Sequence, residues 1–164
     1  MRHAILTCFL VCCCLAASSV HAANQIRHAE LAEKVVSLSS LYLAGGREET
    51  IIKMKEIRKS LGKKVIFSIV QVTDKEAGKI LYHPTPFVTG NYVQAATDAE
   101  NRYVGRNLIE KAQKIEPGKL FWVEYSHKNG FDERLIRQMC CARVDSSMIC
   151  GSMPSAGKLP ETFK

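Results

Sequence analysis

The sequence predicts an α+β domain in which helices pack on an antiparallel sheet of about five strands. Two amphipathic segments precede any strand, a third lies between strands, and the remaining strand-like segments follow one another directly along the chain. The expected order is helix, helix, strand, strand, helix, strand, strand, strand. Runs of adjacent strands with helices outside them indicate an antiparallel sheet covered by helices.

The first two helices are amphipathic and are separated by glycines. Residues 26–42 carry apolar residues at steps of four, three and four, which trace one helical stripe. The segment 44–46 ends this helix, because glycine takes the left-handed closing conformation without strain. A second helix follows over residues 47–62, with acidic residues in its first turn and Gly62 at its end. The inward residues are Leu31, Val35, Leu38 and Tyr42, then Ile51, Met54, Ile57 and Leu61.

The strands are recognised by β-branched and aromatic residues. Residues 64–74 form such a run, and a turn over residues 75–78 leads to residues 79–83, which predicts a hairpin. Residues 119–127 are the most strand-like segment of the chain. The last pair of strands is expected over residues 134–144 and residues 147–153.

The third helix is expected between the second and third strands. Thr97 is followed three residues later by Glu100, a capping-box pattern that predicts a helix start. Pro117 and Gly118 end the helix. Its apolar face would carry Val104, Leu108, Ala112 and Ile115.

Residues 1–22 are typical of a secretory signal peptide. They begin with a basic segment, continue with an apolar run from Ala4 to Ala17, and end with small residues at the cleavage positions Val20 and Ala22. A membrane-spanning helix needs about 20 apolar residues, so this run is too short to favour an anchor. We therefore expect a periplasmic or secreted protein whose mature part, 164 − 22 = 142 residues, forms one domain.

The charge and the cysteines limit the function classes. Loss of Arg2 with the signal peptide changes the formal net charge from +7 to +6. The basic residues alternate with acids and are not interleaved with aromatics, which favours a solvated surface over nucleic-acid binding. The charge supports only a mild preference for anionic ligands. Of seven cysteines, four lie in the signal peptide, so an oxidising compartment would leave one disulfide and one thiol.

The position of the turn between the last two strands decides which cysteines pair. A two-residue turn at Asp145 and Ser146 places Cys141 opposite Cys150, which is the pairing that we favour. A three-residue loop would bring Cys140 to Cys150 instead. Neighbouring residues of a strand point to opposite faces, so only one of the two can bridge, and we expect the other thiol to be buried.

An ordered set of residues over positions 26–153 resembles a single Cache domain, an extracytoplasmic small-molecule sensor module. The set comprises Asp74 and Gly78, His83 and Pro84, Gly90 and Asn91, Asp98, Gly118, Trp122 and Tyr125, and Gly151. The resemblance implies a PAS-like five-stranded antiparallel sheet, a long N-terminal helix packed against it, and a pocket on the central strands. Such domains bind small metabolites, often carboxylates, and signal to a membrane receptor or kinase.

The chain departs from the family pattern in two respects. It shows no transmembrane or signalling segment, so the resemblance implies a free-standing version. Many members have a lysine before the penultimate strand, where Arg134 or Arg137 is the nearest equivalent here.

The irregular tail is expected over residues 154–164.

Five residues are candidates for the ligand site. His83, locked in extended geometry by Pro84, could bond a carboxylate or, in the alternative, only its own backbone. Arg134 offers a planar fork for a carboxylate, or is a solvated side chain. Strand alternation puts Trp122 and Tyr125 on opposite faces. We expect Tyr125 to line the pocket. Trp122 would line it only if the strand is bulged, and otherwise belongs to the core. Tyr92 is a candidate for a lid over the pocket.

Catalysis is not expected. The cysteines lack a local nucleophile signature, and His28, His83 and His127 are too far apart in the sequence for a metal set. We expect no cofactor. The predicted function is binding of a small organic anion, a carboxylate metabolite above all. The protein would act with a membrane receptor or a sensor kinase. Formation of a homodimer is left open. The competing hypothesis is a secreted structural or protein-interaction domain that has lost ligand binding.

Overall fold

The computed structural model describes residues 26–128 and 133–159. The expected signal peptide at residues 1–22 therefore lies outside the described residues, as does the end of the expected tail, residues 160–164. Within the described ranges, no helix is both long and apolar enough to cross a membrane.

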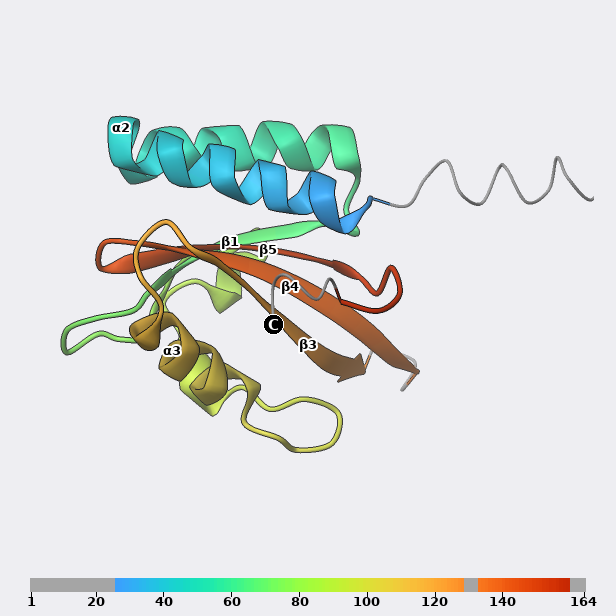
Figure 1. The fold of residues 1–164 in the computed structure, drawn as a ribbon. Coiled ribbons are helices and arrows are strands. Elements are labelled where there is room, and N and C mark those ends of the chain that lie inside the picture. The colour runs from blue at the N-terminus through green and yellow to red at the C-terminus, as the bar shows by residue number, and fades with distance from the viewer. Residues whose placement is uncertain (1–25, 129–132, 160–164) are drawn as a thin grey trace, which may run out of the picture.

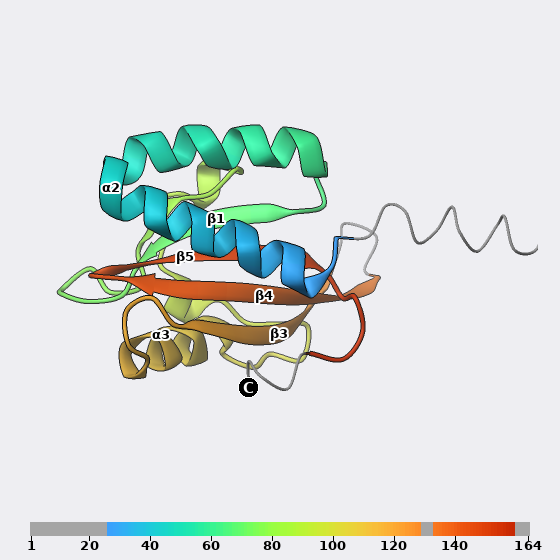
Figure 2. The same ribbon diagram turned by 45° about the horizontal axis from the view of Figure 1, so that its top comes forward.

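The long helix α2 (His28–Leu61) is a hairpin of two helical halves. Gly46 interrupts it with φ 76° and ψ −171°, a conformation that glycine adopts readily because it has no Cβ. The Thr50 hydroxyl donates to the Gly46 carbonyl oxygen over 2.8 Å, which secures the first turn of the second half. Figures 1 and 2 show both halves on the same side of the sheet. The predicted pair of helices is confirmed.

Five antiparallel strands form one sheet in the order β2-β1-β5-β4-β3. The last strand of the chain therefore lies at the centre and pairs with the first, and the edges are β2 and β3. The predicted fold class, a five-stranded antiparallel sheet with a long N-terminal helix packed against it, is confirmed. The strands are β1 (Ile66–Gln71), β2 (Ile80–Tyr82), β3 (Leu120–Lys128), β4 (Arg134–Val144) and β5 (Ser147–Pro154).

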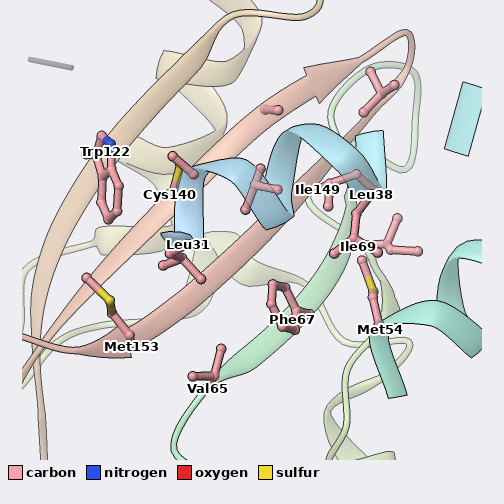
Figure 3. Close-up of a cluster of buried hydrophobic side chains, with 14 residues drawn as sticks. Leu31, Leu38, Met54, Val65, Phe67, Ile69, Trp122, Cys140, Ile149 and Met153 are labelled. Atoms are coloured by element: carbon pink, nitrogen blue, oxygen red, sulfur yellow. The ribbon is translucent and has the colours of Figure 1, made fainter. Parts of the chain in front are cut away.

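The sheet has a face covered by α2 and a face covered by α3 (Val104–Lys114), and we call these the α2 face and the α3 face (Figure 1). On the α2 face, apolar side chains of the helix interlock with those of the strands, as Figure 3 shows. Gly151 lets α2 approach β5: a Cβ there would lie 2.9 Å from the Leu31 side chain and 3.0 Å from that of Phe67. Buried residues of this core include Leu31, Val35, Leu38, Met54, Val65, Phe67, Ile69, Trp122, Cys140, Ile149 and Met153.

The predicted start of the third helix is wrong. The helix begins at Val104 and not after Thr97, and its N-cap Tyr103 makes no side-chain capping bond. The reason is Asp98, whose carboxylate Oδ1 accepts the backbone N–H groups of Glu100 and Arg102, each over 2.9 Å. These bonds hold residues 98–102 in a compact loop and take up the donors that a helix would otherwise use.

The predicted register of the last two strands is confirmed. Val144 pairs with Ser147 across the two-residue turn, and Cys141 lies directly opposite Cys150 with their Cα atoms 4.2 Å apart. The two sulfur atoms are in bonding contact on the α3 face. Cys140 points to the α2 face as a buried free thiol, and burial raises its pKa to about 12. The alternative pairing of Cys140 with Cys150 is therefore excluded by the turn.

Candidate functional site

Three polar residues of β3, β4 and β5 meet on the α3 face, and we call them the polar cluster: Tyr125, Arg137 and Ser152. Tyr125 pairs directly with Arg137 across β3 and β4, and Ser152 lies on the neighbouring strand β5. The Tyr125 hydroxyl lies 3.0 Å from the Ser152 Oγ, and the Arg137 Nε donates to the same Oγ over 2.9 Å. The serine hydroxyl thus links the phenol to the guanidinium.

Arg137 is held in place by acceptors that, among the described residues, are all neutral. Its Nη2 donates to the carbonyl oxygen of Lys64 over 2.8 Å and to that of Ser152 over 3.2 Å. Among the residues that the structure describes, Arg137 makes no ion pair, and its Nη1 has no hydrogen-bond partner. A guanidinium has five N–H donors in a planar fork. The protein therefore orients this half-buried cation without neutralising its charge.

An apolar surface adjoins the polar cluster on the same face. Strand alternation places Met139 and Cys141 of β4 on the same side as Arg137. Helix α3 covers the far end of this surface with its buried residues Leu108 and Ile109. An apolar floor with a few fixed polar groups at one end is the usual arrangement of a small-molecule site. The buried residues are Val70, Val72, Ile80, Leu108, Ile109, Ala112, Phe121, Cys141, Met148 and Cys150.

His83 lies at the opposite edge of the sheet from Tyr125. The ring Nδ1 accepts the backbone N–H of Thr85 over 3.1 Å, and the backbone N–H of His83 donates to the Thr89 Oγ1 over 3.1 Å. Burial, followed by the charge of Arg58, lowers the pKa of the ring. Four strand intervals of about 4.8 Å separate the edge strands β2 and β3 by about 19 Å. His83 therefore makes local hydrogen bonds, as the alternative without a ligand role expects, and it does not lie near the polar cluster.

Arg134 is engaged by an acid. Its Nη2 lies 2.6 Å from the Glu100 Oε1, and its side chain is 59% exposed. Glu100 also accepts the Ser126 hydroxyl and pairs with Arg102. Arg134 is therefore an exposed side chain that already has an acidic partner in Glu100.

The two remaining candidates lie apart from the polar cluster. Trp122 is buried in the α2-face core (Figure 3). Its ring meets that of His28 edge-on, with the ring centroids 5.0 Å apart. It also borders a groove along the outer edge of β3. Tyr92 is about half exposed, and its backbone forms an isolated antiparallel β-bridge with Lys79 beside β2. The predicted placement of Trp122 and Tyr125 on opposite faces is confirmed.

Sequence reasoning ranked Arg134 ahead of Arg137 and did not single out Ser152. The pairing of the two strands could have identified Arg137 as the neighbour of Tyr125. If Lys128 faces Arg134 at the end of the hairpin, then Tyr125 faces Arg137, and paired residues share a face of the sheet. Ser152 carries no comparable local signal, because its place depends on the pairing of β5.

The loop before α3 is folded around the Asp98 carboxylate and is joined to β3 by a hydrogen bond. Asp98 is buried, and burial alone would raise its pKa. Hydrogen bonds from the Arg102 side chain and from the backbone N–H groups of Arg102 and Glu100 outweigh burial and lower the pKa to about 2. The backbone N–H of Ala99 donates to the Ser126 Oγ over 3.1 Å. The ionised Asp98 carboxylate therefore holds the loop together, and the hydrogen bond of Ala99 joins the loop to β3.

Solved structures share this architecture at low sequence identity. The periplasmic sensor domain of a chemotaxis protein aligns over 76% of this chain and 88% of its own, with a TM-score of 0.50 and 13% identity. A methyl-accepting chemotaxis protein from Vibrio parahaemolyticus aligns over 74% of this chain and 81% of its own, with a TM-score of 0.51 and 15% identity. The fold is that of a chemotaxis sensor domain.

The five-stranded sheet and the long N-terminal helix that the resemblance implied are thus confirmed as a fold. A structure described as the basis for carboxylic acid recognition by a Cache chemosensory domain aligns over 94% of this chain and 99% of its own, with a TM-score of 0.48 and 12% identity. No protein-family model and no curated protein matches the sequence.

Proposed function

We propose that this chain is an exported sensor or binding domain that holds a small carboxylate metabolite on the α3 face. One observation carries the proposal. Arg137 is a half-buried guanidinium whose described partners are all neutral and whose Nη1 has none. A carboxylate is the planar partner that such a fork binds with two parallel hydrogen bonds.

The neighbouring residues suit such a ligand. Tyr125 presents a phenol beside the guanidinium and can donate to a second ligand oxygen. Met139 offers an apolar and adaptable contact for a short carbon chain. Ligand binding without chemistry is the favoured activity, because the cysteines of the described residues offer no thiolate: Cys141 and Cys150 are paired and Cys140 is buried.

Communication with a membrane receptor or sensor kinase is part of the proposal and is supported by the sensor-domain fold. An occupied site would neutralise Arg137 and change its bonds to Lys64, which lies between α2 and β1. Ligand binding is therefore coupled by one hydrogen bond to the segment that leads out of the N-terminal helix.

The test is a thermal-shift screen of the protein against small monocarboxylates and dicarboxylates, followed by calorimetric titration of the hits. A ligand at a hundredfold excess over its Kd stabilises the folded state by about 2.7 kcal/mol. For a domain of this size, this raises the melting temperature by roughly 5–10 °C. Arg137→Gln should reduce affinity at least tenfold, because a charge-assisted pair is lost.

Arg134→Gln is the matched control, since it removes the same charge from the same strand at a residue that Glu100 already neutralises. It should leave affinity within about twofold. If Arg134→Gln abolishes binding and Arg137→Gln does not, the site lies at the Glu100 loop and the polar cluster is not involved. If no carboxylate shifts the melting temperature, the proposal fails and the structural or interaction domain is the better account.

A further inference from the structure

A groove rich in basic residues lies between the end of α2 and the end of β2. It encloses about 550 Å³ and shares no lining residue with the polar cluster. We call it the basic groove. Its lining residues are Lys55, Arg58, Lys59, Gly62, Lys63, Tyr82 and Pro84.

The four cations of the basic groove are not neutralised. None of Lys55, Arg58, Lys59 and Lys63 forms an ion pair with any residue that the structure describes, and no acid lines the groove. Elsewhere on the same half of α2, Lys53 lies 3.0 Å from the Glu56 carboxylate. Like charges that share a hollow repel one another, and an anion between them removes that repulsion.

Arg58 adds a second, independent observation. Its Nε is buried and has no hydrogen-bond acceptor among the described residues. Its positive charge also acts on the rings of Tyr82 and His83. Burial raises the pKa of the Tyr82 phenol and lowers the pKa of the His83 imidazole, and the charge of Arg58 acts to lower both pKa values. A buried guanidinium donor without an acceptor is costly, and a bound anion would satisfy it.

The end of α2 does not account for these charges. Arg58 and Lys59 lie in the last turn of the helix, where cations favourably meet the partial negative charge of its C-terminus. That partial charge amounts to about half an elementary charge. It is much smaller than the four full charges around the basic groove, so the local field stays positive.

We propose that the basic groove binds a phosphate group. Inorganic phosphate and phosphate monoesters carry more than one negative charge near pH 7 and a phosphodiester carries one, and all of them offer several acceptor oxygens to lysines and to an arginine fork. Tyr82 can donate its hydroxyl to one of these oxygens. The same group could belong to a soluble phosphate compound or to the head of an anionic phospholipid, and the groove is open enough to accept either.

The first arm of the test uses inorganic phosphate, titrated into the full chain by calorimetry at low ionic strength. Arg58→Lys retains the charge but removes the buried Nε, and it should weaken binding about tenfold. Lys59→Gln should weaken binding about threefold to tenfold. Lys53→Gln is the matched control: it removes one charge from the same helical half outside the groove and should change affinity less than twofold.

The second arm measures sedimentation with vesicles of phosphatidylglycerol in phosphatidylcholine, and with phosphatidylcholine alone. Binding of inorganic phosphate without vesicle binding assigns a soluble ligand, and binding only to the anionic vesicles assigns a lipid head group. Both outcomes support the phosphate site if Arg58→Lys weakens them. The proposal is overturned if neither probe binds, or if Arg58→Lys and Lys59→Gln behave like Lys53→Gln while all variants keep the wild-type melting temperature.

Discussion

Gln138 and Arg137 are neighbours on β4 and point to opposite faces of the sheet. Gln138 is fully buried on the α2 face, yet all its hydrogen-bonding positions are filled. Its Oε1 lies 2.7 Å from the His28 Nε2 and accepts the Ala156 N–H, while its Nε2 donates to Glu124 and to the Gly157 carbonyl. Arg137 on the α3 face keeps unused donors.

This difference separates scaffold from site. On the α2 face, the buried Gln138 amide is satisfied within the protein, and apolar side chains fill the space between helix and strands. On the α3 face, a fixed cation stands at the end of an apolar surface with part of its bonding capacity free. Unused donors held in fixed geometry therefore mark the candidate site better than the presence of polar residues does.

The comparison predicts its largest effect at Phe67 on the α2 face. Phe67→Ala should lower the free energy of unfolding by about 3–5 kcal/mol, because a fully buried ring is replaced by a cavity. Denaturant unfolding measures the loss, and Phe67→Leu gives a milder variant should Phe67→Ala not fold.

Met139→Ala is the counterpart on the α3 face. Met139 is only partly buried, so a smaller loss is expected than for Phe67→Ala. Equal losses at the two positions would show that both faces are packed alike and would argue against a site beside Met139.

Reduction of the Cys141 and Cys150 pair should have the next largest effect. A bridge that closes a loop of about ten residues stabilises the folded state by about 2–3 kcal/mol in the chain-entropy treatment. Unfolding curves with and without a phosphine reductant measure this difference. In Cys141→Ser/Cys150→Ser the reductant should change nothing.

Cys140 provides the internal control. Burial raises its pKa to about 12, so the folded protein should not be alkylated there by iodoacetamide at pH 8, whereas the unfolded chain should be. Peptide mapping by mass spectrometry locates the label. Rapid labelling of Cys140 in the folded state would contradict the packing of the α2 face.

Asp98 makes the loop on the α3 side sensitive to acid. Its folded-state pKa of about 2 lies below the ordinary value of 3.8, so its contribution to stability is complete above pH 4 and is lost as the pH falls toward 2. Asp98→Asn should be less stable than wild type at pH 7 and should lose less stability between pH 4 and pH 2.

Chemical denaturation at several pH values measures this slope for both proteins. Asp74→Asn is the comparison variant, since no described hydrogen bond or ion pair gives Asp74 a guanidinium partner. Parallel slopes for wild type and Asp98→Asn would contradict an ionised, hydrogen-bonded Asp98.

The smallest effect on stability is expected at Tyr125. Tyr125→Phe removes the bond to the Ser152 hydroxyl, which keeps its bond from the Arg137 Nε, so the loss should be about 1 kcal/mol or less. Affinity for a carboxylate ligand should fall more than stability does. A large loss of stability without any change in affinity would make Tyr125 part of the scaffold.

Local patterns predicted the features of this fold that depend on neighbouring residues. Gly45 and Gly46 separated the two helices, and the alternation along residues 119–127 placed Trp122 and Tyr125 on opposite faces. The two-residue turn set the register of Cys141 and Cys150. Each of these depends on backbone geometry within a few residues or across one tight turn.

The features that local patterns did not predict depend on distant parts of the chain. Thr97 and Glu100 match a capping box, but Asp98 lies between them, is buried, and binds the same backbone. The place of His83 follows from the order of the strands, which puts β2 and β3 at opposite edges and which no local pattern contains. The choice of Arg137 over Arg134 required the pairing of β3 with β4.

The central position of β5 has a consequence for how the chain acquires its structure. Pairing joins Ile66 to Ser152, residues from the two ends of the domain, so the sheet closes only when the last strand has been synthesised. Until then β1 has β2 as its only neighbour, and a pair of strands has little stability alone. Contacts so distant in sequence also slow folding. A growing chain of this topology therefore completes its sheet only after its last strand has been added.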